Sequence, residues 1–300
     1  MIDRRGPFRP GDQVQLTDEK GRRHRLVLAE GRSFHTHRGS IAHDDLIGQQ
    51  EGSVVRASGG TWYVALRPLL ADYTVSMARG ATVVYPKDAA QIVGLADVFP
   101  GARVVEAGAG SGALSCWLLR AVGEAGLLLS YERRADFADV ARSNVEAYFG
   151  GPHPAWRLVV GDLPGSDGAG DGDGGPAAHD FDRVVLDMLA PWEHVAGAAT
   201  WLAPGGLICG YVATTTQLSR LVEALRGHGG FDEPAAWESI QRGWHVEGLA
   251  VRPEHRMVGH TGFLVTARRL ACGVTAPPRR RRPAKGALHG TGSDSSDDSK

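Results

Sequence analysis

The sequence predicts an α/β protein with a doubly wound parallel sheet, preceded by a small domain of short β-strands. Three features of the 300-residue chain support this prediction. From residue 102 onward, apolar β-forming runs alternate with helix-forming stretches, which is the pattern of a parallel sheet. A glycine-rich turn follows the first of these runs. Before residue 75, by contrast, short apolar runs are separated only by turn residues.

The N-terminal part of the chain is expected to form hairpins. Residues 18–21 and 58–60 are rich in glycine, aspartate and serine, and each group lies between two apolar runs. Turn residues between two apolar runs are typical of β-hairpins. We therefore expect a small β-domain over residues 1–75, with several arginines that can contact phosphates. A solvated strand face is the alternative explanation for those arginines.

Two further segments have unusual composition. Residues 164–180 are rich in glycine, aspartate and proline, which predicts a flexible insertion in the larger domain, over residues 76–272. Residues 273–300 contain a run of arginines, then serine and aspartate, with almost no apolar side chains. Such a segment cannot bury enough apolar surface to fold, so we expect a disordered tail.

Composition excludes several classes of protein. The net charge of −1 gives no overall attraction to nucleic acid, so any basic surface must be local. No apolar run has the length of a membrane span, and we expect no signal peptide, because no apolar stretch follows the first residues. Three cysteines without metal spacing, and a His35–His37 pair without a third ligand, argue against a metal site. We therefore expect a cytoplasmic protein that contains no metal and does not enter a membrane.

The glycine-rich turn, residues 106–115, connects the first strand of the larger domain to a helix. This layout exposes free backbone N–H groups to a nucleotide-like ligand. Gly108, Gly110 and Ala113 fit the dinucleotide pattern G-x-G-x-x-A, so an NAD enzyme is one alternative. Glu106, two residues before the first glycine, favours the acidic-x-G-x-G-x-G form used by S-adenosylmethionine-dependent methyltransferases.

Carboxylates also stand at the ends of the next three strands. Glu132 ends the second strand, where it can accept hydrogen bonds from both ribose hydroxyls of a nucleoside. Asp162 follows the third strand and can accept one from the adenine amino group of the cofactor. Asp187 ends the fourth strand. Ligands of open α/β sheets bind beyond the carboxyl ends of the strands, so we expect these side chains along one edge.

The C-terminal third is expected to contain two more strands, around residues 246–251 and 263–268. Between them, residues 252–262 form a loop of basic and small residues. Such a loop is suited to an RNA backbone or a base. An exposed charged loop without a ligand is the alternative.

Together these segments resemble the bacterial tRNA (adenine-58-N1)-methyltransferases of the TrmI family, close to the actinobacterial members. The resemblance covers roughly residues 5–272 and depends on residues 72–73, 85–92, 106–112, 186–192 and 259–263. It implies a class I S-adenosylmethionine-dependent methyltransferase domain with a Rossmann-like sheet, assembled as a homotetramer. It also implies methylation of ring nitrogen N1 of adenine 58 in the T loop of tRNA.

The resemblance implies roles for individual residues as well. Asp187 would be the catalytic carboxylate, with Tyr85 and His260 shaping the pocket for the target base. The residues implied to hold the cofactor are Glu106, Gly108, Gly110, Ser111, Gly112, Ala113, Leu114, Glu132, Asp162, Leu163 and Asp187. N1 of adenine carries a lone pair, so proximity and alignment are expected to supply most of the acceleration.

Three alternatives remain at this point. A methyltransferase acting on another RNA adenine, on a protein or on a small molecule would share the cofactor-binding half. A non-catalytic RNA-binding subunit would be expected to lack the glycine loop or Asp187, and both are present. An NAD enzyme has the least support, because nothing in the sequence resembles a hydride-transfer site.

Overall fold

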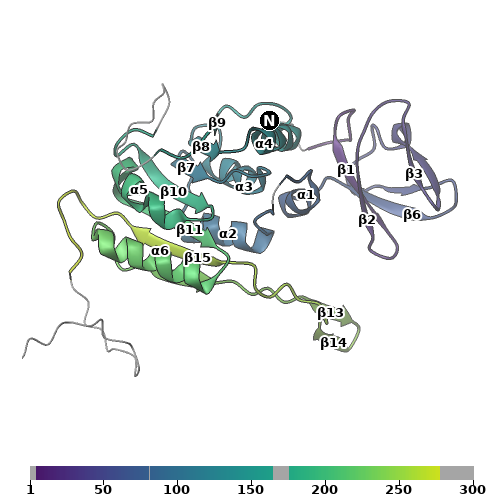
Figure 1. Ribbon diagram of the computed structural model, residues 1–300. Helices are drawn as coiled ribbons and strands as arrows, with labels where there is room; N and C mark the ends of the chain where they lie inside the picture. Colours follow the sequence, from purple (N-terminus) through teal and green to yellow (C-terminus); the bar gives the residue numbers. More distant parts are fainter. Residues whose placement is uncertain (1–4, 81, 165–175, 278–300) are drawn as a thin grey trace, which may run out of the picture.

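The computed structural model describes residues 5–80, 82–164 and 176–277. These residues form a four-stranded sheet near the N-terminus and a seven-stranded sheet flanked by helices, as Figure 1 shows. The predicted insertion therefore falls largely outside the described residues, at 165–175, as does most of the predicted tail, at 278–300.

The N-terminal sheet is antiparallel throughout, with the strand order β2-β1-β6-β5. Its strands are β1 (Gln13–Asp18), β2 (Arg23–Val27), β5 (Val54–Arg56) and β6 (Trp62–Leu66). Both predicted hairpins, β1–β2 and β5–β6, are thus confirmed. A third hairpin, β3 (Ser33–Thr36) with β4 (Gly39–Ala42), was not predicted, and it precedes the short helix η1 (His43–Asp45).

The large sheet has the order β12-β15-β11-β10-β7-β8-β9. Neighbouring strands from β9 to β11 are parallel, and β15 runs antiparallel to both β11 and β12. The strands are β7 (Arg103–Ala107), β8 (Leu127–Glu132), β9 (Trp156–Val160), β10 (Phe181–Asp187), β11 (Leu202–Val212), β12 (Ala235–Glu238) and β15 (Phe263–Arg268). The predicted α/β fold, with its parallel core, is confirmed.

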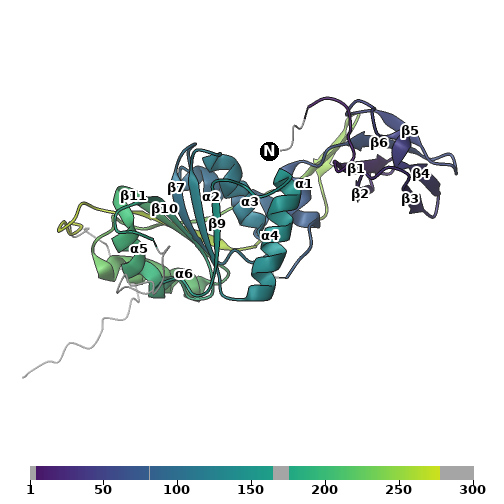
Figure 2. The same ribbon diagram turned by 90° about the horizontal axis from the view of Figure 1, so that it is seen from above.

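Helices cover both faces of this sheet, as Figure 2 shows. Successive side chains of a strand point to opposite faces, so Val104 and Val105 of β7 belong to two separate cores. One core lies under α1 (Leu70–Ser76), α2 (Pro86–Leu95), α3 (Ala113–Val122) and α4 (Ala135–Phe149). The other lies under α5 (Val195–Trp201) and α6 (Thr215–His228), with η2 (Pro191–His194) leading into α5.

The predicted strand around residues 246–251 is wrong. This stretch contains the turn of a separate hairpin, β13 (Trp244–Glu247) with β14 (Ala250–Pro253), which projects away from the sheet in Figure 1. Gly248, at φ +54°, allows the chain to reverse there. The sheet strand is β12, which has only one large apolar residue, Trp237. The apolar run was misleading because its side chains remain exposed instead of packing into a core.

The strand order determines where a ligand can bind. From β7 the chain passes through α3 to β8, whereas from β10 it passes through α5 to β11, on the opposite side. The crevice between the carboxyl ends of β7 and β10 is therefore the topological switch point. Among the described residues, no helix combines the length and apolar character needed to cross a membrane.

Candidate active site

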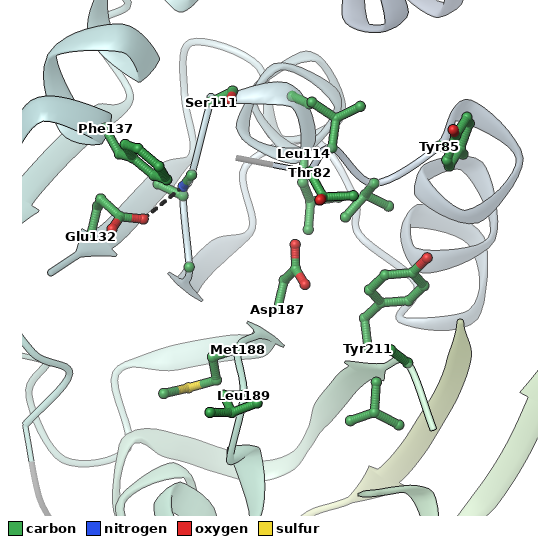
Figure 3. A pocket seen from close by; sticks show the side chains of 18 of the residues that line it. Thr82, Tyr85, Ser111, Leu114, Glu132, Phe137, Asp187, Met188, Leu189 and Tyr211 are labelled. Atoms are coloured by element: carbon green, nitrogen blue, oxygen red, sulfur yellow. Dashed lines mark hydrogen bonds between the residues drawn. The ribbon is translucent and has the colours of Figure 1, made fainter. Parts of the chain in front are cut away.

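A pocket of about 680 Å³ opens at this switch point. Figure 3 shows Asp187 near its centre, with Glu132 and Ser111 on one side and Tyr85 and Tyr211 on the other. The residues that line it are Thr82, Val83, Val84, Tyr85, Gly108, Ala109, Gly110, Ser111, Ala113, Leu114, Glu132, Arg134, Phe137, Asp187, Met188, Leu189, Tyr211, Val212, Ala213, Gln217 and Thr261.

The glycine loop has the conformation that its sequence demands. Gly108, Gly110 and Gly112 all have φ between +55° and +88°, a region that disfavours other residues. A Cβ added to Gly108 would stand 1.8 Å from the Asp187 carbonyl oxygen, so β7 and β10 can meet only at a glycine. Gly112 precedes α3 and lies close to the Ala141 carbonyl, but it does not line the pocket.

Glu132 lies at the tip of β8 and lines the pocket, where the sequence placed it. Its Oε2 accepts a hydrogen bond from the Gly110 N–H at 2.9 Å, and its Oε1 accepts one from the Arg134 N–H at 3.0 Å. These bonds orient the carboxylate against the glycine loop. An oriented acceptor next to a free backbone turn is suited to paired hydroxyl groups, such as those of a ribose.

Asp187 ends β10, and its side chain points into the pocket in Figure 3. Burial raises the pKa of its carboxyl to about 7, and the nearby carboxyls of Glu106 and Glu132 act in the same direction. Like charges held close together disfavour joint ionisation, so a cationic ligand between them would be stabilised. Perturbed carboxyls in a cleft are typical of functional sites.

Glu106 was expected to hold the cofactor, but it does not line the pocket. It is fully buried beneath the glycine loop, where its Oε2 accepts hydrogen bonds from Ser115 Oγ at 2.7 Å and Ser130 Oγ at 2.5 Å. Its Oε1 has no hydrogen-bond partner among the described residues. Burial raises the pKa of this carboxyl to about 7. Glu106 thus affects the pocket through its charge and through the loop above it.

Asp162 and Leu163 also lie outside the pocket lining. The Asp162 side chain is 79% exposed, and its Oδ1 is 3.9 Å from the Nε of Arg133. Leu163 is buried in the core beside α5. The assignment of these two residues to a cofactor remains a prediction.

Tyr85 and His260 occupy different environments. Tyr85 is the N-cap residue of α2 and lines the pocket. His260 does not line it; its Nδ1 is 2.8 Å from Glu238 Oε1 and its Nε2 is 2.8 Å from the Ala213 carbonyl oxygen. Both neighbours only accept hydrogen bonds, so this geometry requires a doubly protonated imidazolium ring. The same two contacts raise the pKa of His260. The histidine therefore acts on the pocket indirectly, by holding Ala213.

Sequence reasoning missed Tyr211, the second-to-last residue of β11, which lines the pocket beside Asp187. It stands at a strand end, as the predicted carboxylates do, and the same rule applied to aromatic residues would have found it. Met188 and Leu189, directly after Asp187, were also missed as lining residues. The described residues contain no cluster of three or more His, Cys, Asp or Glu side chains arranged to hold a metal ion.

Comparison with known proteins gives matches along most of the chain. A family described as TrmI-like N-terminal matches residues 6–55, and one described as tRNA methyltransferase complex GCD14 subunit matches residues 61–249. The tRNA (adenine(58)-N(1))-methyltransferase TrmI of Thermus thermophilus is 39% identical over 254 residues, which cover 85% of this chain and 95% of that protein.

Two further proteins are similar. The tRNA (adenine(57)-N(1)/adenine(58)-N(1))-methyltransferase TrmI of Methanocaldococcus jannaschii is 32% identical over 270 residues, covering 84% of this chain and 93% of that protein. A crystal structure described as a SAM-dependent O-methyltransferase from Thermotoga maritima superposes with a TM-score of 0.80. It has 30% sequence identity and covers 92% of this chain and 96% of that one.

Proposed function

Because this chain belongs to the TrmI family of tRNA (adenine-58-N1)-methyltransferases, we propose that it methylates ring nitrogen N1 of adenine 58 in tRNA, with S-adenosylmethionine as the methyl donor. The observation that carries this function is the pocket at the switch point of a class I methyltransferase fold, where Glu132 and Asp187 both face one crevice. Such sheets bind their ligands at this place.

The residues present fit S-adenosylmethionine. The glycine loop lets the backbone approach a ligand, and the Glu132 carboxylate can accept hydrogen bonds from two ribose hydroxyls. The Glu106 carboxyl, whose pKa burial raises to about 7, lies beneath the glycine loop and favours a positive charge nearby. When bound, the cofactor supplies an electrophilic methyl group on a sulfonium cation.

The side chains of the pocket explain how the target base would be held. Tyr85, at the rim, offers an aromatic face for a base that has left its stack. Asp187 points into this pocket, where a preoriented carboxylate would stabilise the positive charge that grows on an adenine ring as its N1 becomes substituted. The mechanism needs alignment and electrostatic stabilisation, and no covalent intermediate with the protein.

Binding of tRNA is supported by a second cavity, of about 310 Å³, that shares Tyr85 with the main pocket. Arg242 and Arg256 line it, and within the described ranges neither is paired with a carboxylate. Glu254 lies nearby, against Gly243, so the cavity is not uniformly basic. Unpaired guanidinium groups beside the pocket are suited to the phosphates that flank a target nucleotide.

The function is tested by incubating tRNA transcripts with the enzyme and S-adenosylmethionine, then digesting them to nucleosides for mass spectrometry. We expect 1-methyladenosine from a transcript with adenosine at position 58, and none when position 58 is uridine. Free adenosine should not be methylated. Equal methylation of both transcripts, or methylation at the 6-amino group, would contradict the proposed site of reaction.

The same assay tests the arginine pair. Arg242→Ala and Arg256→Ala should each raise KM for tRNA. Each should also reduce the slope of the logarithm of the tRNA association constant against the logarithm of salt concentration by about 1, because each arginine neutralises roughly one phosphate. Affinity for S-adenosylmethionine should stay unchanged. Arg120→Ala is the matched control, since Arg120 is exposed near the far end of α3.

We also propose a homotetramer, supported by the exposed hairpin β13–β14. Trp244, Val246 and Val251 are all more than half exposed, and Leu249 at its tip is fully exposed. An isolated two-stranded hairpin is marginally stable in water, so a second copy of the chain is the expected cover. We propose three further features. The chain divides into domains at residues 75 and 272, its N-terminal domain contacts tRNA, and the protein is located in the cytoplasm.

Native mass spectrometry tests the assembly. We expect a tetramer at micromolar concentration, and dissociation when Val246→Glu and Val251→Glu are combined, because charged side chains in an apolar interface are costly to desolvate. His245→Gln, a polar change on the same hairpin, should leave the tetramer intact. A stable wild-type monomer would refute the assembly without affecting the proposed reaction.

A further inference from the structure

The start of α2 contains a buried ion pair that has no role in the reaction proposed so far. The side chains of Lys87 and Asp88 are only 7% and 1% exposed, and their charged ends are 2.7 Å apart. Asp88 receives two more hydrogen bonds at its Oδ2, from Thr261 Oγ1 at 2.5 Å and from the Tyr211 hydroxyl at 3.2 Å. One carboxylate thus joins α2, the end of β11 and the loop before β15.

A count of protons determines the direction of the Tyr211 hydrogen bond. The ammonium group of Lys87 has three N–H donors, which go to Asp88 Oδ1, to Thr261 Oγ1 at 2.5 Å and to the Ser239 carbonyl oxygen at 2.7 Å. The Thr261 hydroxyl hydrogen goes to Asp88. Asp88, as a carboxylate, can only accept, so the Tyr211 hydroxyl must donate its single hydrogen to it. Only lone pairs of the Tyr211 oxygen remain for other partners.

The Tyr211 ring is also fixed in place. A Cβ added to Gly262 would stand 2.5 Å from the ring, so the ring packs directly on this glycine. Figure 3 shows Tyr211 beside Asp187, on the side of the pocket where α2 begins. Burial and the nearby carboxylates of Asp88 and Asp187 raise the pKa of the Tyr211 phenol, so the hydroxyl keeps its proton at neutral pH.

We propose that Asp88 is a positioning residue that makes the Tyr211 hydroxyl an obligate hydrogen-bond acceptor, and that this oxygen receives one N–H of the 6-amino group of the target adenine. This inference rests on the proposed function. The amino group has a second N–H, which is free to reach Asp187. As positive charge spreads from N1 onto the amino group, both bonds become charge-assisted and strengthen.

This arrangement also selects the base. Guanine and hypoxanthine carry a carbonyl oxygen where adenine carries its amino group. That oxygen would face the lone pairs of Tyr211, with no proton between them. A site built to accept a substrate N–H discriminates strongly against an analogue that cannot donate one, because buried polar groups are then left unpaired.

The experiment compares two tRNA transcripts that differ only at position 58, one with adenosine and one with purine riboside, which keeps N1 but lacks the 6-amino group. Turnover at saturating S-adenosylmethionine is measured for wild type, Tyr211→Phe and Asp88→Asn. On the adenosine transcript we expect both variants to lose roughly tenfold to a hundredfold. On the purine riboside transcript they should stay within about threefold of wild type, since the bond is already absent.

Thr261→Val is the comparison variant, because it removes the Thr261 bonds to Asp88 and Lys87 but keeps the Tyr211 hydroxyl. Any loss that it causes should be equal on the two transcripts. An equal loss by Tyr211→Phe on both transcripts would overturn the proposal, as would wild-type turnover of that variant on adenosine. Should Asp88→Asn fail to fold, as its melting curve would show, Tyr211→Phe still decides. Wild-type enzyme that makes no 1-methyladenosine would instead reject the proposed function.

Discussion

Asp187→Ala is expected to lower turnover about a hundredfold to a thousandfold, or roughly 2.7–4 kcal/mol, while affinity for S-adenosylmethionine changes only a few-fold. The reason is the position of the carboxylate, which ends β10 and points into the pocket proposed to hold the adenine ring. Glu132 is the residue proposed to hold the ribose of the cofactor, which would leave Asp187 free to act on the base. Its interaction is strongest in the transition state and therefore affects rate more than binding.

Single-turnover kinetics at saturating S-adenosylmethionine and tRNA measure this effect. Glu193→Ala is a suitable control, because Glu193 is an exposed carboxylate in the segment that follows Asp187. If Asp187 only held the cofactor, the variant would recover its rate at saturation. That recovery would remove Asp187 from the chemical step.

The pH dependence of kcat/KM follows from the same carboxyl. Burial raises the pKa of Asp187 to about 7 in the free enzyme, and the ionised form is the one that can offset positive charge. Activity should therefore rise with pH up to about 7 and level off above it, losing tenfold per pH unit well below that value. Asp187→Asn cannot titrate, so its profile should lack this limb.

Gly108→Ala is the second change with a large expected effect. Alanine at φ +88° costs about 1–2 kcal/mol, and its methyl group would collide with the Asp187 carbonyl oxygen, which adds about 1–3 kcal/mol. We expect a loss of about 2–5 kcal/mol in the free energy of unfolding, together with a distorted cofactor loop. Urea denaturation measures the first, and S-adenosylmethionine binding by calorimetry measures the second.

Gly101→Ala separates the two causes. Gly101 has φ +90°, nearly the same backbone conformation, but nothing lies within 4 Å of the added Cβ. It should lose only about 1–2 kcal/mol and should bind S-adenosylmethionine normally. If both variants lose the same amount, the contact between the β7 and β10 ends is not what requires a glycine at position 108.

The sequence by itself determined the fold class and the binding edge. Apolar runs of strand length alternating with helical stretches are local patterns, and only a parallel sheet with helices on both faces buries them. The glycine turn and the acidic residues Glu132 and Asp187 were predictable for a related reason. Parallel strands bring their carboxyl ends to one edge, so position along the chain implies position in space.

Only the tertiary structure decided which of these residues face the pocket. Glu106 and Glu132 both stand at strand ends, yet one is sealed beneath the glycine loop and the other lines the cavity. The pleat of a strand points neighbouring side chains to opposite faces, and the depth of a side chain depends on what packs above it. For the same reason, the sequence did not show that the apolar run at 246–251 lies in an exposed hairpin. A periodic pattern does not show which face of a strand packs against another element.

No local sequence pattern predicts the contacts around Asp88. Lys87 meets Thr261 across 174 residues of sequence, and Tyr211 meets Asp88 across 123. Each side chain read alone is an ordinary polar residue at the end of a helix, strand or loop. Their shared burial exists only once α2, β11 and the segment before β15 have packed together. The donors and acceptors can be counted only in the assembled network. The inference that Tyr211 offers an acceptor to the pocket therefore depends on the tertiary structure.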